Sequence, residues 1–236
     1  MNLIIKRLLL TCSLGLAAIS QAADSGGRTG FYTMGDIGAS FVQKLAFDRI
    51  LGVNTGTPAE VSVNTGVRGT LGIGYSFVPT FAAELETGFS YNETKNFSEA
   101  TGGVQNGNLR FWVVPVTVGV NWRPLLSPPP PETELETFRP LERAFRSLRP
   151  YVGGGIGAAA VFGEIDNPDA TNPVGGSGRD TVLTYYVKTG LSYPLNDRTE
   201  LGVQYRFYGT TGFTVKETHT DELFAHVVSV VLRISF

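Results

Sequence analysis

The sequence predicts an all-β fold, an eight-stranded antiparallel up-and-down transmembrane β-barrel. Three observations predict it. The chain opens with an export signal, and only 17% of its 236 residues are charged, against roughly 25% in soluble proteins. Apolar residues alternate with small polar ones in segments of the length that a tilted strand needs to cross a bilayer. After the signal, no apolar run approaches the roughly 18 residues of a transmembrane helix.

Residues 1–22 have the features of a signal peptide. Lys6 and Arg7 precede an apolar run of about a dozen residues, which is too short to span a membrane. The small residue Ala22 suits signal peptidase, so we expect cleavage after it. Residues 23–236 then form the outer-membrane β-barrel domain.

The exported chain has a simple composition. Its only cysteine, Cys12, lies in the signal, so neither a disulfide nor a thiolate nucleophile is expected. Removing Lys6 and Arg7 leaves 17 basic residues against 21 acidic ones, a formal charge of about −4. Such a chain gives no indication of nucleic-acid binding, and we expect no cofactor and no metal.

Two hairpins carry the clearest strand pattern. In 67–77 and 81–91, large apolar residues take most alternate positions, with Gly, Ser, Thr, Ala and single charges between them. The same pattern recurs in 181–193 and 200–208, joined by a short turn. Four further strands complete an even number: residues 31–41, 109–122, 151–162 and 223–236.

The connections alternate in length around the ring. Those at 42–66, 92–108, 163–180 and 209–222 are long and polar, and we interpret them as loops. Those at 78–80 and 194–198 are short. Transmembrane barrels show this asymmetry, with long loops outside the cell and tight turns in the periplasm.

A Pro-rich insert at about 123–150 breaks this rule. It is expected on the periplasmic side, where its run from Pro128 to Pro131 should be stiff and extended. From Pro140 onward the pattern indicates a short basic amphipathic helix. Two interpretations stay open: a tolerated linker, or a helix lying on the inner leaflet.

The apolar face of the wall is predicted to meet lipid. The opposite face carries mostly Gly, Ser and Thr with isolated charges, whereas a soluble barrel would place many charges in water. Aromatic residues gather near strand ends, as an interfacial girdle requires. These aromatic residues are Tyr75, Phe77, Phe81, Trp122, Tyr193 and Phe236.

The predicted interior holds four charges of each sign, so we expect it to be neutral and paired. An eight-stranded lumen is only just filled by side chains, and unpaired buried charges there cost several kcal/mol each. Glu200 and Arg233 should approach each other near the periplasmic rim. A proton or ion pathway through this network is the alternative. The lumen charge network comprises Asp36, Arg68, Glu84, Glu86, Lys188, Glu200, Arg206 and Arg233.

Other patterns look like chemistry but have simpler explanations. Residues 155–160 match G-x-G-x-x-A, yet no parallel βαβ pattern surrounds them. His226 and Ser229 should lie on opposite faces of the wall, and His219 lies in a loop beside acids. The acidic run at 164–169 lacks the spacing of a calcium loop.

Four segments resemble a known family. They are residues 30–41 (GFYTMGDIGASF), 150–157 (PYVGGGIG), 205–207 (YRF) and 230–236 (VVLRISF). They are similar to the eight-stranded outer-membrane barrels that include the outer membrane protein A barrel and opacity-type surface proteins. The resemblance implies this fold, outer-membrane lipid around it and assembly by the insertion machinery. The insert and Val231, where relatives often have Gly, depart from it.

The leading functional prediction is a structural or surface-interaction barrel, not an enzyme, with a plugged polar lumen in the outer membrane of a Gram-negative-type bacterium. An unknown extracellular partner would bind its loops. The alternative is a narrow channel for small solutes, and a lipid-modifying barrel enzyme ranks third. Counting back by twos from Phe236 gives a lipid-facing row, so we interpret this residue as an assembly signal.

Overall fold

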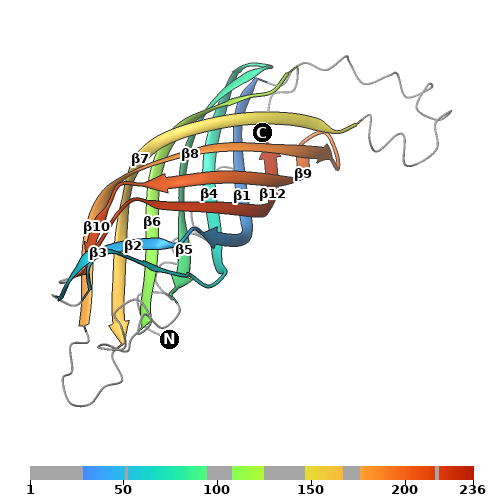
Figure 1. The fold of residues 1–236 in the computed structure, drawn as a ribbon. Helices are drawn as coiled ribbons and strands as arrows, with labels where there is room; N and C mark the ends of the chain where they lie inside the picture. The colour runs from blue at the N-terminus through green and yellow to red at the C-terminus, as the bar shows by residue number, and fades with distance from the viewer. Residues whose placement is uncertain (1–28, 51–52, 95–107, 125–146, 167–175, 216–217) are drawn as a thin grey trace.

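The computed structural model describes residues 29–50, 53–94, 108–124, 147–166, 176–215 and 218–236. Within them, twelve strands form a closed barrel of eight and a separate sheet of four (Figure 1). The barrel strands are β1 (Gly30–Val42), β4 (Gly66–Val78), β5 (Phe81–Glu93), β6 (Asn108–Trp122), β7 (Arg149–Asp166), β8 (Gly176–Pro194), β9 (Thr199–Thr210) and β12 (Leu223–Ser235). The smaller sheet contains β2 (Leu45–Ile50), β3 (Val53–Val61), β10 (Phe213–Val215) and β11 (Thr218–Thr220). No helix in the described ranges is long and apolar enough to span a membrane.

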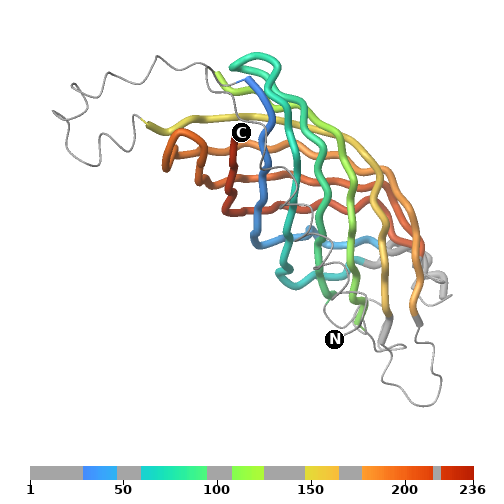
Figure 2. Tube along the Cα trace, turned by 180° about the vertical axis from the view of Figure 1, so that it is seen from behind, coloured from blue at the N-terminus to red at the C-terminus, as the bar shows by residue number. Residues whose placement is uncertain are grey.

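The barrel closes because β1 pairs both with the next barrel strand, β4, and with the last one, β12. Residues 30–40 run antiparallel to 66–76 of β4, and residues 32–42 run antiparallel to 225–235 of β12. Figure 2 shows the last strand, in red, beside the first, in blue. The remaining neighbours follow chain order and are all antiparallel. The prediction of an eight-stranded up-and-down barrel is confirmed.

The two ends of the barrel differ in their connections. Short turns at 79–80 and 195–198 lie at one end, called here the turn end, where β1 begins and β12 finishes. The opposite end is called the loop end. The insert at 123–150 joins β6 to β7 at the turn end, but 125–146 lie outside the described residues, as do the signal peptide and Cys12.

Exposure alternates along the strands as the sequence predicts. Val118 exposes 59% of its surface, whereas its neighbour Thr117 exposes 3%. The exterior is therefore apolar and the turn-end interior polar, the reverse of a soluble barrel. Five of the six predicted girdle residues are exposed, and Phe236 is half-buried. The exposed five are Tyr75, Phe77, Phe81, Trp122 and Tyr193.

Two segments interpreted as loops, 42–66 and 209–222, contain strands, so that interpretation is wrong. They supply β2 and β3 from the first segment and β10 and β11 from the last. These strands form one sheet in the order β10-β11-β2-β3, which lies at the loop end (Figure 1). β2 pairs with the adjacent β3, and β10 with the adjacent β11, whereas the β11–β2 pairing that joins these two hairpins is non-local and leaves no local pattern.

Strands β7 and β8 run further than predicted, into the expected loop at 163–180. Their pairing continues to Ile165 and Gly176. The extended part of β8 anchors the smaller sheet, because the backbone N–H of Thr214 in β10 donates to the Asp180 carboxylate at 2.8 Å. The smaller sheet is therefore tied to the wall by β8 as well as by its own chain connections.

Glycines make room for large inward side chains. A Cβ on Gly119 would lie 2.5 Å from the Tyr186 hydroxyl, and one on Gly155 would lie 2.8 Å from the Tyr186 ring. Likewise a Cβ on Gly74 would lie 2.2 Å from the ring of Tyr32. These positions explain the glycine-rich strands, because bulky tyrosines cross a narrow lumen beside them.

The lumen divides into two halves. Toward the loop end it holds an apolar core, in which inward residues of the wall meet side chains of the smaller sheet and its flanks. Phe111 of β6 and Phe213 of β10 have ring centroids 6.3 Å apart. Toward the turn end the lumen is filled by charged and polar side chains, described next.

Candidate functional site

All eight predicted lumen charges point into the barrel. None exposes more than 11% of its side chain. They occupy those alternate positions along each strand whose side chains point into the lumen, and this brings them together inside the barrel. The candidate site is therefore the charge network that fills the turn half of the lumen.

The centre of the network is Lys188 of β8. Its ammonium group contacts the carboxylates of Glu84 and Glu86 on β5, across the lumen, and the Glu86 contact measures 2.6 Å. Arg206 of β9 binds the other Glu86 oxygen at 2.7 Å and lies 3.7 Å from Asp36 of β1. These pairs join four strands through the middle of the barrel, so each charge is buried with a partner of opposite sign.

Arg68 differs from this pattern. Its guanidinium lies 4.2 Å from the centre of the Tyr208 ring, a cation–π geometry, and no ion pair to it occurs among the described residues. The expectation that every interior charge is paired with an opposite charge is therefore not met at Arg68. The side chain is 2% exposed, so the aromatic face replaces part of its lost hydration.

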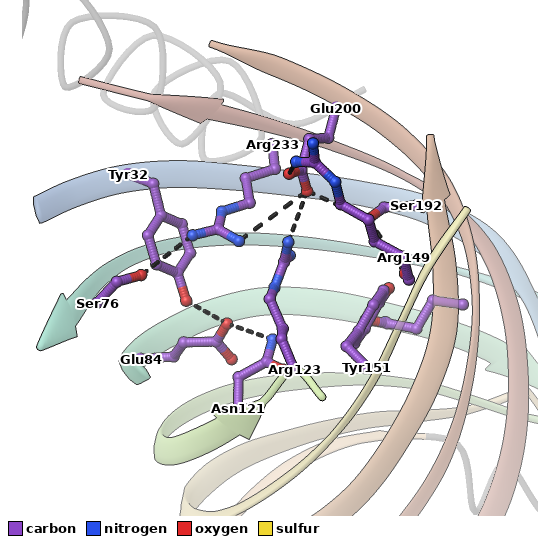
Figure 3. A network of polar contacts seen from close by, with 11 residues as sticks. Tyr32, Ser76, Glu84, Asn121, Arg123, Arg149, Tyr151, Ser192, Glu200 and Arg233 are labelled. Carbon is purple, nitrogen blue, oxygen red and sulfur yellow. Dashed lines mark hydrogen bonds and ion pairs between the residues drawn. The ribbon is translucent and has the colours of Figure 1, made fainter. Parts of the chain in front are cut away.

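At the turn end, three arginines surround one carboxylate (Figure 3). The Glu200 carboxylate accepts hydrogen bonds from Arg123 at 2.7 Å and from Arg149 at 2.9 Å. Arg233, opposite Glu200 in the β9–β12 register, lies 4.0 Å from it, so the two approach each other as expected. We call Arg123, Arg149 and Arg233 the arginine cluster.

Sequence reasoning missed Arg123 and Arg149, which corrects the expectation of a neutral interior. Both were assigned to the insert, because they stand just outside the predicted strands. The alternation of the strands could have identified them. Asn121 and Tyr151 point inward, and the residues two positions further, Arg123 and Arg149, therefore point inward as well. With them, six cationic side chains share the lumen with four carboxylates in the part of the chain that the structure describes.

Tyr32 connects the cluster to the centre of the network. Its hydroxyl donates to Glu84 at 2.6 Å, and the Asn121 amide donates to the same oxygen at 2.9 Å. The Arg233 guanidinium stacks 3.7 Å from the centre of the Tyr32 ring (Figure 3). The network is therefore continuous from the turn-end opening to the middle of the lumen.

A small cavity lies within this half, between the arginine cluster and Lys188. It offers about 20 Å³ to the centres of water molecules, enough for roughly one of them. Its lining includes Gln204, whose Nε2 is buried without a hydrogen-bond partner. Polar and charged side chains from several strands line it, among them Glu84, Asn121 and Lys188.

The other patterns that looked like chemistry lie apart from this network. Residues 155–160 lie inside β7, with strand instead of helix after them. His226 faces outward, with Nδ1 2.6 Å from the Tyr205 hydroxyl, whereas Ser229 is 3% exposed on the inner face. His219 lies on β11 and contacts Thr214. Residues 167–169 of the acidic run lie outside the described ranges. Within those ranges, His, Cys, Asp and Glu residues form no cluster that could bind a metal ion.

Phe236 follows the last barrel strand directly. Its backbone N–H donates to the carbonyl of Phe31 at 3.0 Å, which extends the pairing of the first and last strands to the final residue. The side chain is half-buried. Its role as an assembly signal stays a prediction.

Comparison with known proteins identifies the family. The family model described as outer membrane protein beta-barrel domain matches residues 9–236. Among solved structures, the outer membrane protein OprG from Pseudomonas aeruginosa has 12% identity and a TM-score of 0.52, covering 89% of this chain and 99% of that one. Neisserial surface protein A has 15% identity and a TM-score of 0.48, covering 89% and 100%. Among curated proteins, no match is found. The chain therefore belongs to the outer membrane protein β-barrel family, and its eight-stranded wall crosses the outer membrane.

Proposed function

We propose that this protein is a closed, non-conducting barrel that presents its loop end as an interaction surface outside the cell. The filled lumen carries this proposal. The charge network occupies the turn half. An apolar core occupies the loop half, and it includes Leu45, Val61 and Phe213 of the small sheet. An eight-stranded barrel has little room beyond its own side chains.

The orientation follows from the connections. Outer-membrane barrels place tight turns in the periplasm and longer segments outside. On this basis the turns at 79–80 and 195–198 face the periplasm, and the small sheet faces the exterior. Polar groups suited to contact with another molecule lie on the sheet and beside it, such as the exposed ion pair at 3.0 Å between Glu60 of β3 and Lys44, which directly precedes β2.

A catalytic role finds less support. The outward His226 and inward Ser229 cannot form a dyad across the wall. Mass spectrometry of lipid A from cells with and without the protein tests this directly. A mass change that depends on the protein would favour the lipid-modifying enzyme.

Planar-bilayer recording tests whether the barrel is closed. The mature protein, refolded and reconstituted, should give a silent baseline under conditions in which a general porin gives clear current steps. Reproducible steps from the wild-type protein would instead support the narrow channel for small solutes.

Cysteine labelling tests which end faces outward, since the mature chain is expected to lack cysteine. Glu60→Cys in the small sheet should react with a membrane-impermeant maleimide on intact cells. Asp197→Cys, in the exposed turn at the other end, should react only after the outer membrane is permeabilised. The reverse pattern would contradict the proposed exterior surface.

A further inference from the structure

The charges of the lumen are not evenly distributed along its axis. In the deeper part, three carboxylates accompany three cations: Asp36, Glu84 and Glu86 with Arg68, Lys188 and Arg206. At the turn end, one carboxylate, Glu200, accompanies the three guanidiniums of the arginine cluster. Among the described residues, the whole formal excess, three positive charges against one negative, therefore lies at the turn-end opening.

The cluster is held in place but not saturated. Glu200 binds Arg123 and Arg149 through different oxygens, which fixes both guanidiniums. Each guanidinium has five N–H donors, and Glu200 is the only carboxylate paired with them among the described residues. Several donors thus remain available, and the side chains of Arg123 and Arg149 are 18% and 32% exposed.

Two residues that line the cavity have a hydrogen-bond donor without a partner. Gln204 is 2% exposed, lines the cavity and has an Nε2 donor without a partner, and the buried Arg233 Nε also lacks one. Glu84, the other acid in the lining, is already bonded by Tyr32, Asn121 and Lys188. Two buried donors without a partner therefore belong to residues that line the cavity beside the cluster, as does one acceptor, the Asn121 Oδ1, and both acids of the lining already have partners.

We propose that the arginine cluster binds an oxyanion of phosphate chemistry at the periplasmic opening of the barrel. Guanidinium groups match phosphate oxygens in geometry, and several of them fixed around one point bind without reorganisation. The formal excess of two positive charges would be neutralised by one hydrogen phosphate, which carries two negative charges. The anion is either free phosphate or the phosphodiester of an inner-leaflet lipid, since both can reach this opening.

Titration of the refolded mature protein in a maltoside detergent, which carries no phosphate, tests the proposal. One arm adds inorganic phosphate and the other a short-chain phosphatidylglycerol, and the arginine side-chain NMR resonances report binding. Arg149→Gln should weaken binding roughly tenfold or more, and Arg149→Lys should restore part of it. Arg123→Gln provides the second test from a different strand.

Arg198→Gln is the matched control, because it removes the same charge from an exposed turn at the same end but outside the cluster. It should leave the affinity nearly unchanged. The arm that binds at the lower concentration identifies the source of the phosphate. No binding in either arm, or equal weakening by Arg149→Gln and Arg198→Gln, would overturn the proposal.

The acids of the insert offer a competing occupant. If phosphate binds only after Glu132, Glu134 and Glu136 are all replaced by glutamine, the cluster is filled by the chain's own carboxylates. That result would also overturn the proposal of an external anion. A folded barrel in every variant is verified by its heat-dependent mobility shift on gels.

Discussion

The turn half and the loop half of the lumen are filled by different kinds of side chain. In the turn half, long charged side chains of the wall reach across the barrel, as Lys188 does to Glu86. In the loop half, inward apolar residues of the wall, such as Phe111 and Ala159, pack against side chains from the connecting segments. The wall thus fills one half of its lumen with its own charged side chains and shares the other half with its connecting segments.

The two halves should therefore fail differently. The turn half depends on charge pairing, because a buried charge without its partner is costly. The loop half depends on volume, because an apolar core loses stability in proportion to the cavity left behind. The predictions below run from the largest expected effect to the smallest.

Removing Lys188 should have the largest effect on stability. Lys188→Met leaves Glu84 without its cation and Glu86 with Arg206 alone, so the free energy of unfolding should fall by about 3–5 kcal/mol. Urea unfolding in detergent micelles, followed by tryptophan fluorescence, measures it. In the double variant Lys188→Met/Glu84→Gln, which removes one charge of each sign, much of the loss should be recovered. An equal loss in both variants would show that pairing does not control this half.

Truncating the ring contact in the loop half should cost somewhat less. Phe111→Ala should lower the free energy of unfolding by about 3 kcal/mol, because the cavity cannot collapse within a rigid wall. Phe213→Ala should act on the same contact. The double variant should therefore destabilise by less than the sum of the two single variants. Strict additivity would contradict the direct packing of the loop segment against the wall.

Adding a methyl group beside Tyr186 should have a moderate effect that sharpens the boundary between the halves. A Cβ on Gly155 would lie 2.6 Å from the Val118 carbonyl and 2.8 Å from the Tyr186 ring, so Gly155→Ala should cost about 1–3 kcal/mol. The adjacent Gly154→Ala is the control, since its Cβ approaches only a carbonyl at 3.1 Å. Similar unfolding midpoints for the two variants would remove the steric argument.

Replacing Phe236 should have the smallest effect on either half. Phe236→Ser keeps the backbone bond to Phe31, so stability in detergent should change by less than about 1 kcal/mol. Insertion into the outer membrane of cells should nevertheless decrease, if the residue is an assembly signal. Membrane fractionation measures insertion, and an unchanged amount in the outer membrane would argue against that role.

The wall was predictable because its residues alternate with period two. Rows such as Leu71, Ile73 and Tyr75 specify strand, register and outer face at once, since a slip of one residue would turn each side chain into the lumen. The same parity gave all eight charges their inward position. The alternation does not determine which side chain each charge contacts, and so it does not predict that Arg68 lies over the ring of Tyr208.

The small sheet and the arginine cluster escaped prediction for different physical reasons. Strand β3 contains Pro58 and polar residues, and its partner β2 also pairs with the distant β11, a contact that leaves no local pattern. Arg123 and Arg149 lie at the edges of the insert, where composition suggests a linker. Their inward direction follows only when the alternation of each strand is extended, from Asn121 to Arg123 and from Tyr151 back to Arg149.

The pairing of β11 with β2 also has a consequence for the order of events in folding. β2 follows the first barrel strand and β11 precedes the last, so their contact closes a loop of nearly the whole chain. Until β11 arrives, β2 and β3 are a lone hairpin, which is marginal in water. The same late step that seals the wall therefore completes the sheet above it, and protection of β2 amides from hydrogen exchange would record when the barrel has closed.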